Sequence, residues 1–181
     1  MSVQSMKSAA PSDAGDDEEM QAGGEPTQYL TFSLNGEMFA VAIDHIKEII
    51  EFGQPTEVPM MPRFIRGVIN LRGAVVPVID MNARFGREAS AVSRRSCTVI
   101  VEVRSEDGPQ DIGIMVDAVS AVLDIPASDI EPPPSFGARI RAEFLQGMGK
   151  VGGRFVMILN MAQVLSVDEL AHLGDALGAA A

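Results

Sequence analysis

Several residue types that support particular folds or chemistries are scarce in this 181-residue chain. It has no tryptophan, one tyrosine and one cysteine, Cys97. A single cysteine excludes an internal disulfide framework and a cysteine-based zinc site. Because Cys97 begins the apolar run 97–101, we expect it to be a small buried hydrophobic residue rather than a reactive thiol.

Long apolar runs and clustered basic residues are also lacking. No run approaches the roughly 20 apolar residues of a membrane span, and the N-terminus has no apolar segment typical of a secretory signal. We therefore expect a soluble cytoplasmic protein without direct membrane insertion. The formal net charge is −11, and the basic pairs are only Arg94–Arg95 and Arg139/Arg141. This balance argues against binding to nucleic acid.

The chain also lacks the residue constellations of an enzyme. Neither His45 nor His172 has a partner at metal-ligand spacing, and no Gly-x-Ser-x-Gly elbow is present. Residues 147–152 match Gly-x-Gly-x-x-Gly, but they lead into the β-branched and aromatic run 154–159 instead of a helix. A hairpin is therefore favoured over a nucleotide site. We predict no catalytic residue, no cofactor and no metal, and hence a binding module.

Apolar residues make up 46% of the chain, which is enough for a hydrophobic core. Residues 1–26 are rich in Ser, Ala, Gly and acidic residues, a composition that predicts a disordered acidic tail. We expect a second disordered tail over 174–181. The folded part should therefore cover 27–173, which is one domain's length or two very small ones sharing a core.

Short apolar runs separated by turn signals predict β-strands through most of this region. Runs 28–34 and 38–43 flank Asn35-Gly36, a strong hairpin signal. The most informative stretch is 66–80, where two β-branched runs are joined by Asn-Leu-Arg-Gly. Pro77 predicts an edge strand or a bulge in the second run, and Arg72 needs a partner unless it projects into water. Further strands are expected at 97–103, 112–116, 119–125, 144–151 and 154–159.

Helical structure should be limited. We expect Asp44 to cap a short helical turn, residues 63–66 to form another, and 82–96 to be a surface connection. Asn160 should cap an amphipathic C-terminal helix whose inward residues are Met161, Val164, Leu165, Leu170 and Leu173. Many short strands with one sizeable helix predict an all-β fold of two small barrels packed together.

Several of these stretches together resemble the CheW family of chemotaxis coupling proteins. The matching motifs are Tyr29-Leu30-Thr31-Phe32-Ser33-Leu34, Ile46-Lys47-Glu48-Ile49, Phe64-Ile65-Arg66-Gly67-Val68-Ile69-Asn70-Leu71-Arg72-Gly73, Val76-Pro77-Val78-Ile79-Asp80, Gly113-Ile114-Met115-Val116-Asp117-Ala118-Val119 and Phe144-Leu145-Gln146-Gly147-Met148-Gly149. They occur in the family's order and spacing from about 27 to 172.

The resemblance implies a fold, a function and a site. The fold would be two five-stranded β-barrels on a shared core, the first about 38–83 and the second about 97–160, completed by an N-terminal strand and the C-terminal helix. The function would be a non-catalytic adaptor coupling a CheA-type histidine kinase to the cytoplasmic tips of methyl-accepting chemoreceptors, at arrays beneath the inner membrane. Glu48 and Arg72 would form an ion pair. The implied receptor- or kinase-binding residues are Ile46, Glu48, Ile49, Gly67, Asn70, Arg72, Gly113, Val119 and Val122.

Three alternatives are considered. The same adaptor role could serve a non-flagellar chemosensory array controlling surface motility or gene expression. A small-ligand-binding barrel or enzyme could use the 147–152 loop. A CheV-like adaptor would need a receiver domain, for which no length remains after residue 173.

Overall fold

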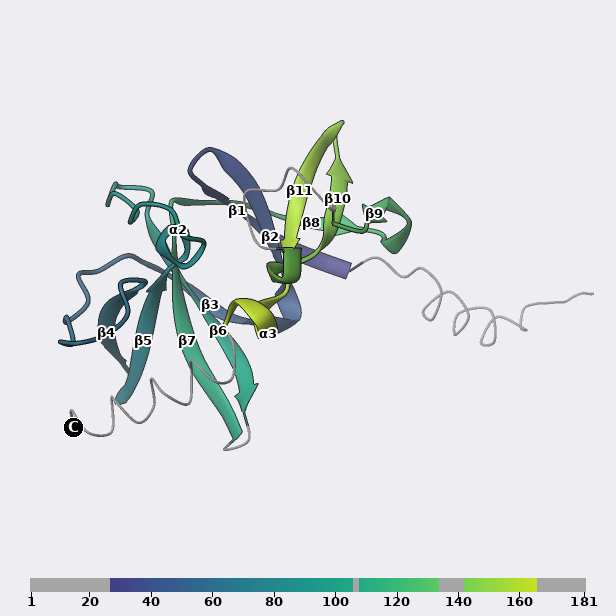
Figure 1. Cartoon of the computed structure of the whole chain (residues 1–181). Helices are drawn as coiled ribbons and strands as arrows, with labels where there is room; N and C mark the ends of the chain where they lie inside the picture. Colours follow the sequence, from purple (N-terminus) through teal and green to yellow (C-terminus); the bar gives the residue numbers. More distant parts are fainter. Residues whose placement is uncertain (1–26, 106–107, 134–141, 166–181) are drawn as a thin grey trace, which may run out of the picture.

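The computed structural model describes residues 27–105, 108–133 and 142–165, whose regular secondary structure is mostly β-strand (Figure 1). The strands are β1 (Thr27–Leu34), β2 (Glu37–Ala42), β3 (Ile46–Glu51), β4 (Ile65–Leu71), β5 (Ala74–Asp80), β6 (Cys97–Ser105), β7 (Gly108–Val116), β8 (Ala118–Ile125), β9 (Ile130–Glu131), β10 (Leu145–Val151) and β11 (Arg154–Leu159). The helices are α2 (Met81–Arg84) and α3 (Met161–Val164). The all-β prediction is confirmed. Both predicted tails, Leu170 and Leu173 lie outside the described residues.

The strands form two open sheets, not two closed barrels. One sheet has six strands in the order β8-β1-β2-β11-β10-β9, and the other has five in the order β3-β6-β7-β5-β4. Among the described residues, no ladder joins the outer strands of either sheet, so the expected barrel closure was too strict a description. Figure 1 shows the two sheets as separate groups of strands, with α2 and α3 near the junction.

The expected barrel boundaries, 38–83 and 97–160, divide the strands differently from these two sheets. The five-stranded sheet is built from one continuous stretch, β3 to β7, whereas the six-stranded sheet combines β1 and β2 with β8 to β11. The reason is that β2 pairs in parallel with β11, and β1 pairs with β8. Pairing between the two ends of the chain cannot be read from local patterns.

The two sheets contain the same arrangement of elements. Each residue of 64–84 in the five-stranded sheet corresponds to the residue 80 positions later, within 144–164, in the six-stranded sheet. Each segment forms a strand, a tight turn, a second strand and one helical turn: β4–β5–α2 and β10–β11–α3. One extra residue makes a bulge in each first strand, Arg66 in β4 and Gln146 in β10. Each second strand pairs in parallel with a strand from elsewhere, β5 with β7 and β11 with β2.

The ends of the two segments are also built alike. Asp80 and Asn160 each cap the following helical turn, because the side chain accepts a hydrogen bond from the backbone N–H three residues on. Their own N–H groups donate to the carbonyls of Phe64 and Phe144, at 2.7 and 2.8 Å. The predicted cap at Asn160 is confirmed, and Met161, Val164 and Leu165 are buried as expected.

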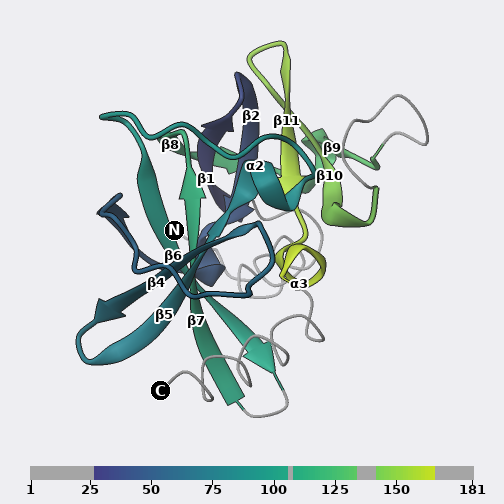
Figure 2. The ribbon, with the colours of Figure 1, turned by 60° about the vertical axis from the view of Figure 1, so that its left-hand side comes forward.

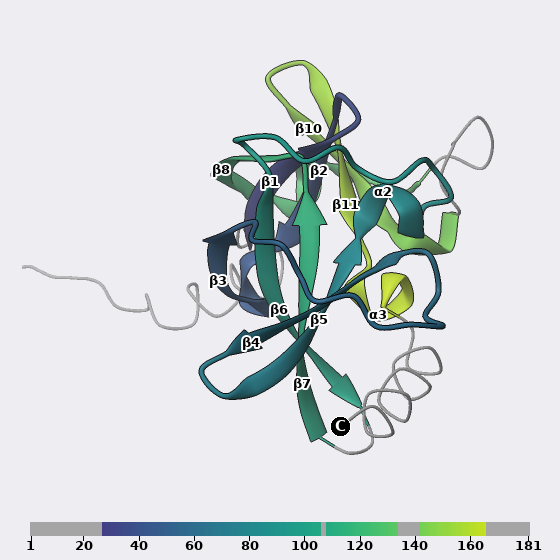
Figure 3. The ribbon, with the colours of Figure 1, turned by 90° about the vertical axis from the view of Figure 1, so that its left-hand side faces the viewer.

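The hairpins β1–β2 and β6–β7, here called the exchanged hairpins, complete the repeat. The hairpin β6–β7 lies between β3 and β5, and the hairpin β1–β2 lies between β8 and β11. Each half of the chain therefore supplies a hairpin to a sheet whose remaining strands come from the other half. Figures 2 and 3 show the resulting crossing of early and late segments.

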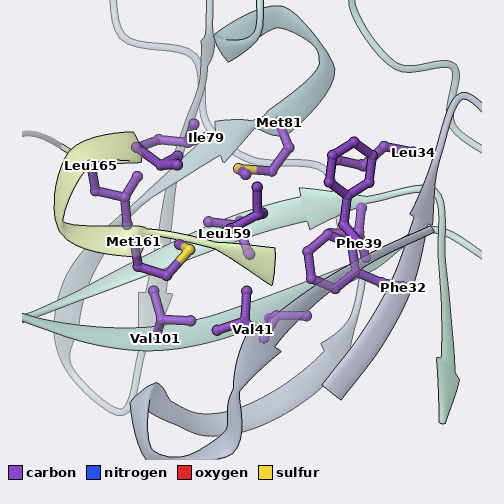
Figure 4. Close-up of a cluster of buried hydrophobic side chains, with 14 of the residues drawn as sticks. Phe32, Leu34, Phe39, Val41, Ile79, Met81, Val101, Leu159, Met161 and Leu165 are labelled. Carbon is purple, nitrogen blue, oxygen red and sulfur yellow. The ribbon is translucent and has the colours of Figure 1, made fainter. Parts of the chain in front are cut away.

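A shared core joins the two sheets. Figure 4 shows side chains from β1, β2 and β11 packed against others from β5, β6, α2 and α3. Four rings, Phe32, Phe39, Phe85 and Phe144, form a chain with successive centroids 6.3, 5.6 and 5.7 Å apart. Ring pairs at these separations add to the stabilisation from burial. Cys97 packs against this core and is partly buried.

Two expected helical turns are wrong or shorter than predicted. Asp44 lies in a 3₁₀ turn, Ile43–His45, but its side chain does not cap that turn, and β3 follows at once. Only Arg63 and Phe64 are in a turn, since β4 begins at Ile65.

Pro77 lies inside β5, which has neighbouring strands on both sides, but the ladder between β5 and β7 begins only at Val78. The proline therefore precedes the pairing on that side.

The expected surface connection 82–96 is partly wrong, because it holds buried polar residues. The fully buried carboxylate of Asp80 accepts hydrogen bonds from the N–H and Oγ of Ser90, at 2.8 and 2.9 Å, and lies 3.5 Å from an Arg66 Nη1. Asn82 donates to Ser90 Oγ and to Asp117. Buried polar groups require such partners, and these lie between 8 and 35 positions away in the chain.

Candidate functional site

The candidate site begins with the backbone of the turn between β4 and β5. Arg72 has a φ of +53° and Gly73 a φ of +88°, the left-handed pair typical of a two-residue hairpin turn. The turns β1–β2 and β10–β11 are of the same kind, and there the first residue is Asn35 or Gly152. Asn and Gly adopt this conformation readily, whereas a long side chain is disfavoured. Such an outlier points to a role for the Arg72 side chain itself.

Arg72 forms a two-pronged ion pair with Glu48 of β3. Its Nη1 lies 2.6 Å from Oε2 and its Nη2 donates to Oε1 at 2.8 Å. β3 and β4 are the opposite edges of the five-stranded sheet, so the pair joins two edges that no ladder connects. A backbone bridge between Thr56 and Val68, at 2.8 and 2.9 Å, joins the connection that follows β3 to β4. The predicted Glu48–Arg72 ion pair is present in the structure.

The pair shifts the protonation equilibria of both partners. The hydrogen bond from Arg72, aided by its charge and that of Lys47, lowers the pKa of Glu48 against a smaller opposing effect of desolvation. The hydrogen bond and charge of Glu48 raise the pKa of Arg72. The Arg72 side chain is 72% exposed and Glu48 28%. Two prongs of the guanidinium therefore hold Glu48 while its remaining N–H donors face solvent, where a partner's acceptors can reach them.

Apolar and polar side chains on the same edge and hairpin complete this surface. Ile49 and Val75 are 43% and 59% exposed. Asn70 is exposed, and its Oδ1 accepts the Gly73 N–H at 3.0 Å, so it shapes the turn. Ile46 is partly buried and packs against the core. Ile46 and Ile49 therefore share β3 with Glu48, and Asn70 and Val75 share the β4–β5 hairpin with Arg72.

Gly67 and Gly113 are buried and act through the backbone. Gly67 has a φ of +146°, and a Cβ there would lie 2.3 Å from the carbonyl oxygen of Thr56. A Cβ on Gly113 would lie 2.8 Å from Cγ2 of Thr98. Both glycines permit close approach of neighbouring chain, and the first permits the Thr56 bridge.

Val119 and Val122 lie on β8, in the other sheet, and are not brought to the ion pair. Val119 is partly buried against the core and Val122 is 47% exposed. In the repeat, β8 occupies the place in the six-stranded sheet that β3 occupies in the five-stranded sheet. The β8 bulge at Ser120 corresponds to the β3 bulge at Lys47, so Val119 and Val122 correspond to Ile46 and Ile49.

The six-stranded sheet has no counterpart of the ion pair. The positions equivalent to Glu48 and Arg72 are Ala121 and Gly152. Phe155, equivalent to Val75, is 51% exposed. The two sheets therefore expose apolar side chains at matching places, but the positions of the Glu48–Arg72 pair are uncharged in the six-stranded sheet.

The charged pair of Lys47 and Asp111 was not predicted. Lys47 Nζ lies 3.1 and 3.2 Å from the two oxygens of Asp111 on β7. These residues are 64 positions apart, and no local pattern connects them. The only signal was that Lys47 precedes Glu48 in the matched motif.

Three further features bear on the predicted function: the glycine-rich residues 147–152, metal-binding clusters and membrane-spanning helices. Residues 147–152 lie in β10 and its turn into β11, as the hairpin interpretation predicted. No three His, Cys, Asp or Glu residues gather at metal-binding distance within 27–105, 108–133 and 142–165. None of the helices in these ranges has the length and hydropathy of a membrane span.

Comparison with known proteins agrees with this geometry. The family model of the CheW-like domain matches residues 28–169. The chain belongs to the CheW family. The chemotaxis protein CheW of Klebsiella aerogenes is 33% identical over 144 residues, covering 80% of this chain and 84% of that protein. Protein FrzA of Myxococcus xanthus is 28% identical over 152 residues, covering 82% and 92%.

A solved CheW structure shares the fold. The scaffolding protein TtCheW from Thermoanaerobacter tengcongensis matches with a TM-score of 0.71 and 33% identity, over 80% of this chain and 91% of that one. CheW-family proteins are non-catalytic scaffolds, and this chain is a chemotaxis adaptor of that kind.

Proposed function

We propose that this CheW-family adaptor couples a CheA-type histidine kinase to the tips of methyl-accepting chemoreceptors, in the cytoplasm at arrays beneath the inner membrane. The observation that carries the proposal is Arg72, a long cation held at a turn position that favours Asn or Gly and paired with Glu48. Such a conformation is retained where the side chain is needed. A folded, non-catalytic protein needs it for recognition.

In this proposal the two sheets serve different contacts. In the five-stranded sheet, β3 with Ile46, Glu48 and Ile49 and the β4–β5 hairpin with Asn70 and Arg72 offer exposed apolar surface and a fixed cation, a combination that gives both affinity and register. The β8 edge with Val119 and Val122 offers apolar contact without the charge. Gly67 and Gly113 contribute by letting the backbone approach, since their own surfaces are buried.

A second candidate function is the same adaptor role in a non-flagellar array that controls surface motility or gene expression. The similarity to Protein FrzA, a relative that does not carry the CheW name, supports this candidate. Recruitment assays with kinases and receptors from each chemosensory system of the source organism distinguish the two functions.

The test of the proposed function is co-sedimentation with receptor signalling fragments and a CheA-type kinase. Wild type should recruit the kinase, and Arg72→Asn should recruit it about tenfold less well, because the cation is lost while the turn keeps a favoured residue. Glu48→Gln should weaken recruitment in the same direction. Circular dichroism should show all variants folded.

Lys150→Met is the matched control for this assay. Lys150 lies 3.5 Å from Glu131 in the other sheet, so its replacement also removes an exposed ion pair. It should leave recruitment unchanged. Wild-type protein that recruits no kinase with any receptor, or folded Arg72→Asn that recruits fully, would contradict the proposed role.

A further inference from the structure

A buried hydroxyl on β1 is hydrogen-bonded to the edge strand β8. The Thr31 hydroxyl donates to the carbonyl of Ala121 at 2.9 Å and accepts the Ala121 N–H at 3.1 Å. Thr31 is 1% exposed, whereas Ala121 is exposed. A threonine hydroxyl offers one donor and two acceptor lone pairs, so this single group meets both backbone groups of Ala121.

These two hydrogen bonds lie at the bulge of β8. Phe32 pairs with Val119 and Thr31 pairs with Ala121, which leaves Ser120 as the extra residue. A bulge disrupts the ladder of backbone hydrogen bonds at that point. The Thr31 hydroxyl therefore ties β1 to β8 directly beside the disruption.

The bulge decides that Val119 and Val122 share a face of the sheet. In a regular strand, residues three positions apart point to opposite faces. With the bulge between them, Val119 lies opposite Phe32 and Val122 lies opposite Leu30. Since Leu30 and Phe32 are two positions apart and both belong to the core, their partners on β8 lie on the same face.

The five-stranded sheet holds its equivalent bulge in a different way. The position equivalent to Thr31 is Ile100, which has no hydroxyl and lies opposite the residue that follows the β3 bulge. There the extra residue itself, Lys47, forms an ion pair with Asp111 at 3.1 Å. Because Ser120 carries no charge, the β8 bulge cannot be held in that way, and Thr31 supplies the side-chain contact instead.

We propose that Thr31 is a positioning residue for the β8 contact surface: its hydroxyl holds the bulge and thereby keeps Val119 and Val122 on one face. A slip of one residue would place Ser120 opposite Phe32 and turn Val119 to the other face. The proposal rests on the proposed function for its effect on partner binding, but the register of β8 can be measured without a partner.

The first test measures the bulge in the full-length protein by NMR. In wild type, the Thr31 hydroxyl proton should be observable and show an Overhauser contact to the Ala121 amide. Thr31→Val removes the hydroxyl and keeps a similar shape, and amide hydrogen exchange at Ala121 should become about tenfold faster, because the N–H loses a buried acceptor. Overhauser contacts between Val119 and Phe32 should weaken in this variant.

Thr31→Ser and Thr98→Val are the matched controls. Thr31→Ser keeps the hydroxyl, so exchange at Ala121 and the Val119–Phe32 contacts should be those of wild type. Thr98 is equally buried, at 2% exposed, but lies on β6 of the other sheet. The same threonine-to-valine change there should leave both readouts unchanged. Circular dichroism should show all three variants folded.

The second test measures recruitment of the kinase to receptor fragments. Thr31→Val should weaken recruitment about fivefold, since one of the two apolar side chains turns away from the partner. Thr31→Ser and Thr98→Val should recruit like wild type.

The outcomes separate the two proposals. The positioning role is overturned if wild type shows no contact between the Thr31 hydroxyl and the Ala121 amide, if both β8 readouts are unchanged in Thr31→Val, or if Thr31→Ser behaves like Thr31→Val. It is also overturned if the register changes while recruitment stays that of wild type. If the β8 readouts behave as expected but wild-type protein recruits no kinase, control of the register by Thr31 stands and the proposed function fails.

Discussion

At the scale of single residues, the fold of the β4–β5 turn does not require an arginine at position 72. Its turn would accept Asn or Gly, as the equivalent turns at Asn35 and Gly152 do. The turn position of Arg72 indicated that it needs a partner, and the family resemblance identified that partner as Glu48. Lys47 and Asp111 were not anticipated, since their contact depends on a bulge and on pairing between distant strands.

The Glu48–Arg72 pair should make the site sensitive to acid. Arg72 lowers the folded-state pKa of Glu48 below the ordinary glutamate value of about 4.3. The pair therefore contributes stability above that ordinary value, and the contribution is lost as pH falls through the lowered pKa. A carboxyl ¹³C NMR titration should place the Glu48 midpoint below the ordinary value in wild type. The Glu48 midpoint should return toward the ordinary value in Arg72→Asn. A midpoint that is the same in both proteins would show that Arg72 does not lower the pKa of Glu48.

At the scale of elements, hairpins were the most predictable part of the fold. Alternating apolar residues around Asn35-Gly36, Arg72-Gly73 and Gly152-Gly153 specify both strands and turn. The segment 82–96 was misjudged because polar residues such as Asn82 and Ser90 normally indicate surface. Here they are buried with Asp80 and Asp117, partners that the local sequence does not reveal.

Gly67 tests how the edge of β4 is built. Gly67→Ala should destabilise the protein by about 1–3 kcal/mol, since the new Cβ would meet the carbonyl of Thr56 at 2.3 Å and force the bridge apart. Gly53→Ala is the control, because a Cβ there meets nothing within 4 Å. Chemical denaturation measures both variants. Equal midpoints for the two would mean that the Thr56 bridge does not constrain the fold.

At the scale of the whole molecule, the shared core should make the two sheets unfold together. Phe39 of β2 stacks on Phe32 and Phe85 and is fully buried between the sheets. Phe39→Ala should lower the free energy of unfolding by about 3–5 kcal/mol. Far-ultraviolet circular dichroism and side-chain NMR signals from each sheet should report one coincident transition. Separate transitions for the two sheets would contradict a common core.

Sequence patterns predicted strands and a shared core, but not which strands share a sheet. Local signals decide the hairpins, whereas the parallel pairs β2–β11 and β5–β7 are formed between segments far apart in the chain. The repeated Phe-x-x-Gly at 64–67 and 144–147 was a sign of the duplication in the sequence.

The exchanged hairpins also determine the order in which the protein can be completed during synthesis. The five-stranded sheet, β3 to β7, is whole once Val116 has emerged from the ribosome, but the hairpin β1–β2 must wait for β8 to β11. Until then, both edges of that hairpin lack their neighbours, and unpaired edges readily accept strands from other chains. A nascent copy can therefore be completed by the late strands of another copy, which makes the β1–β2 hairpin the segment through which newly made chains would become entangled at high expression.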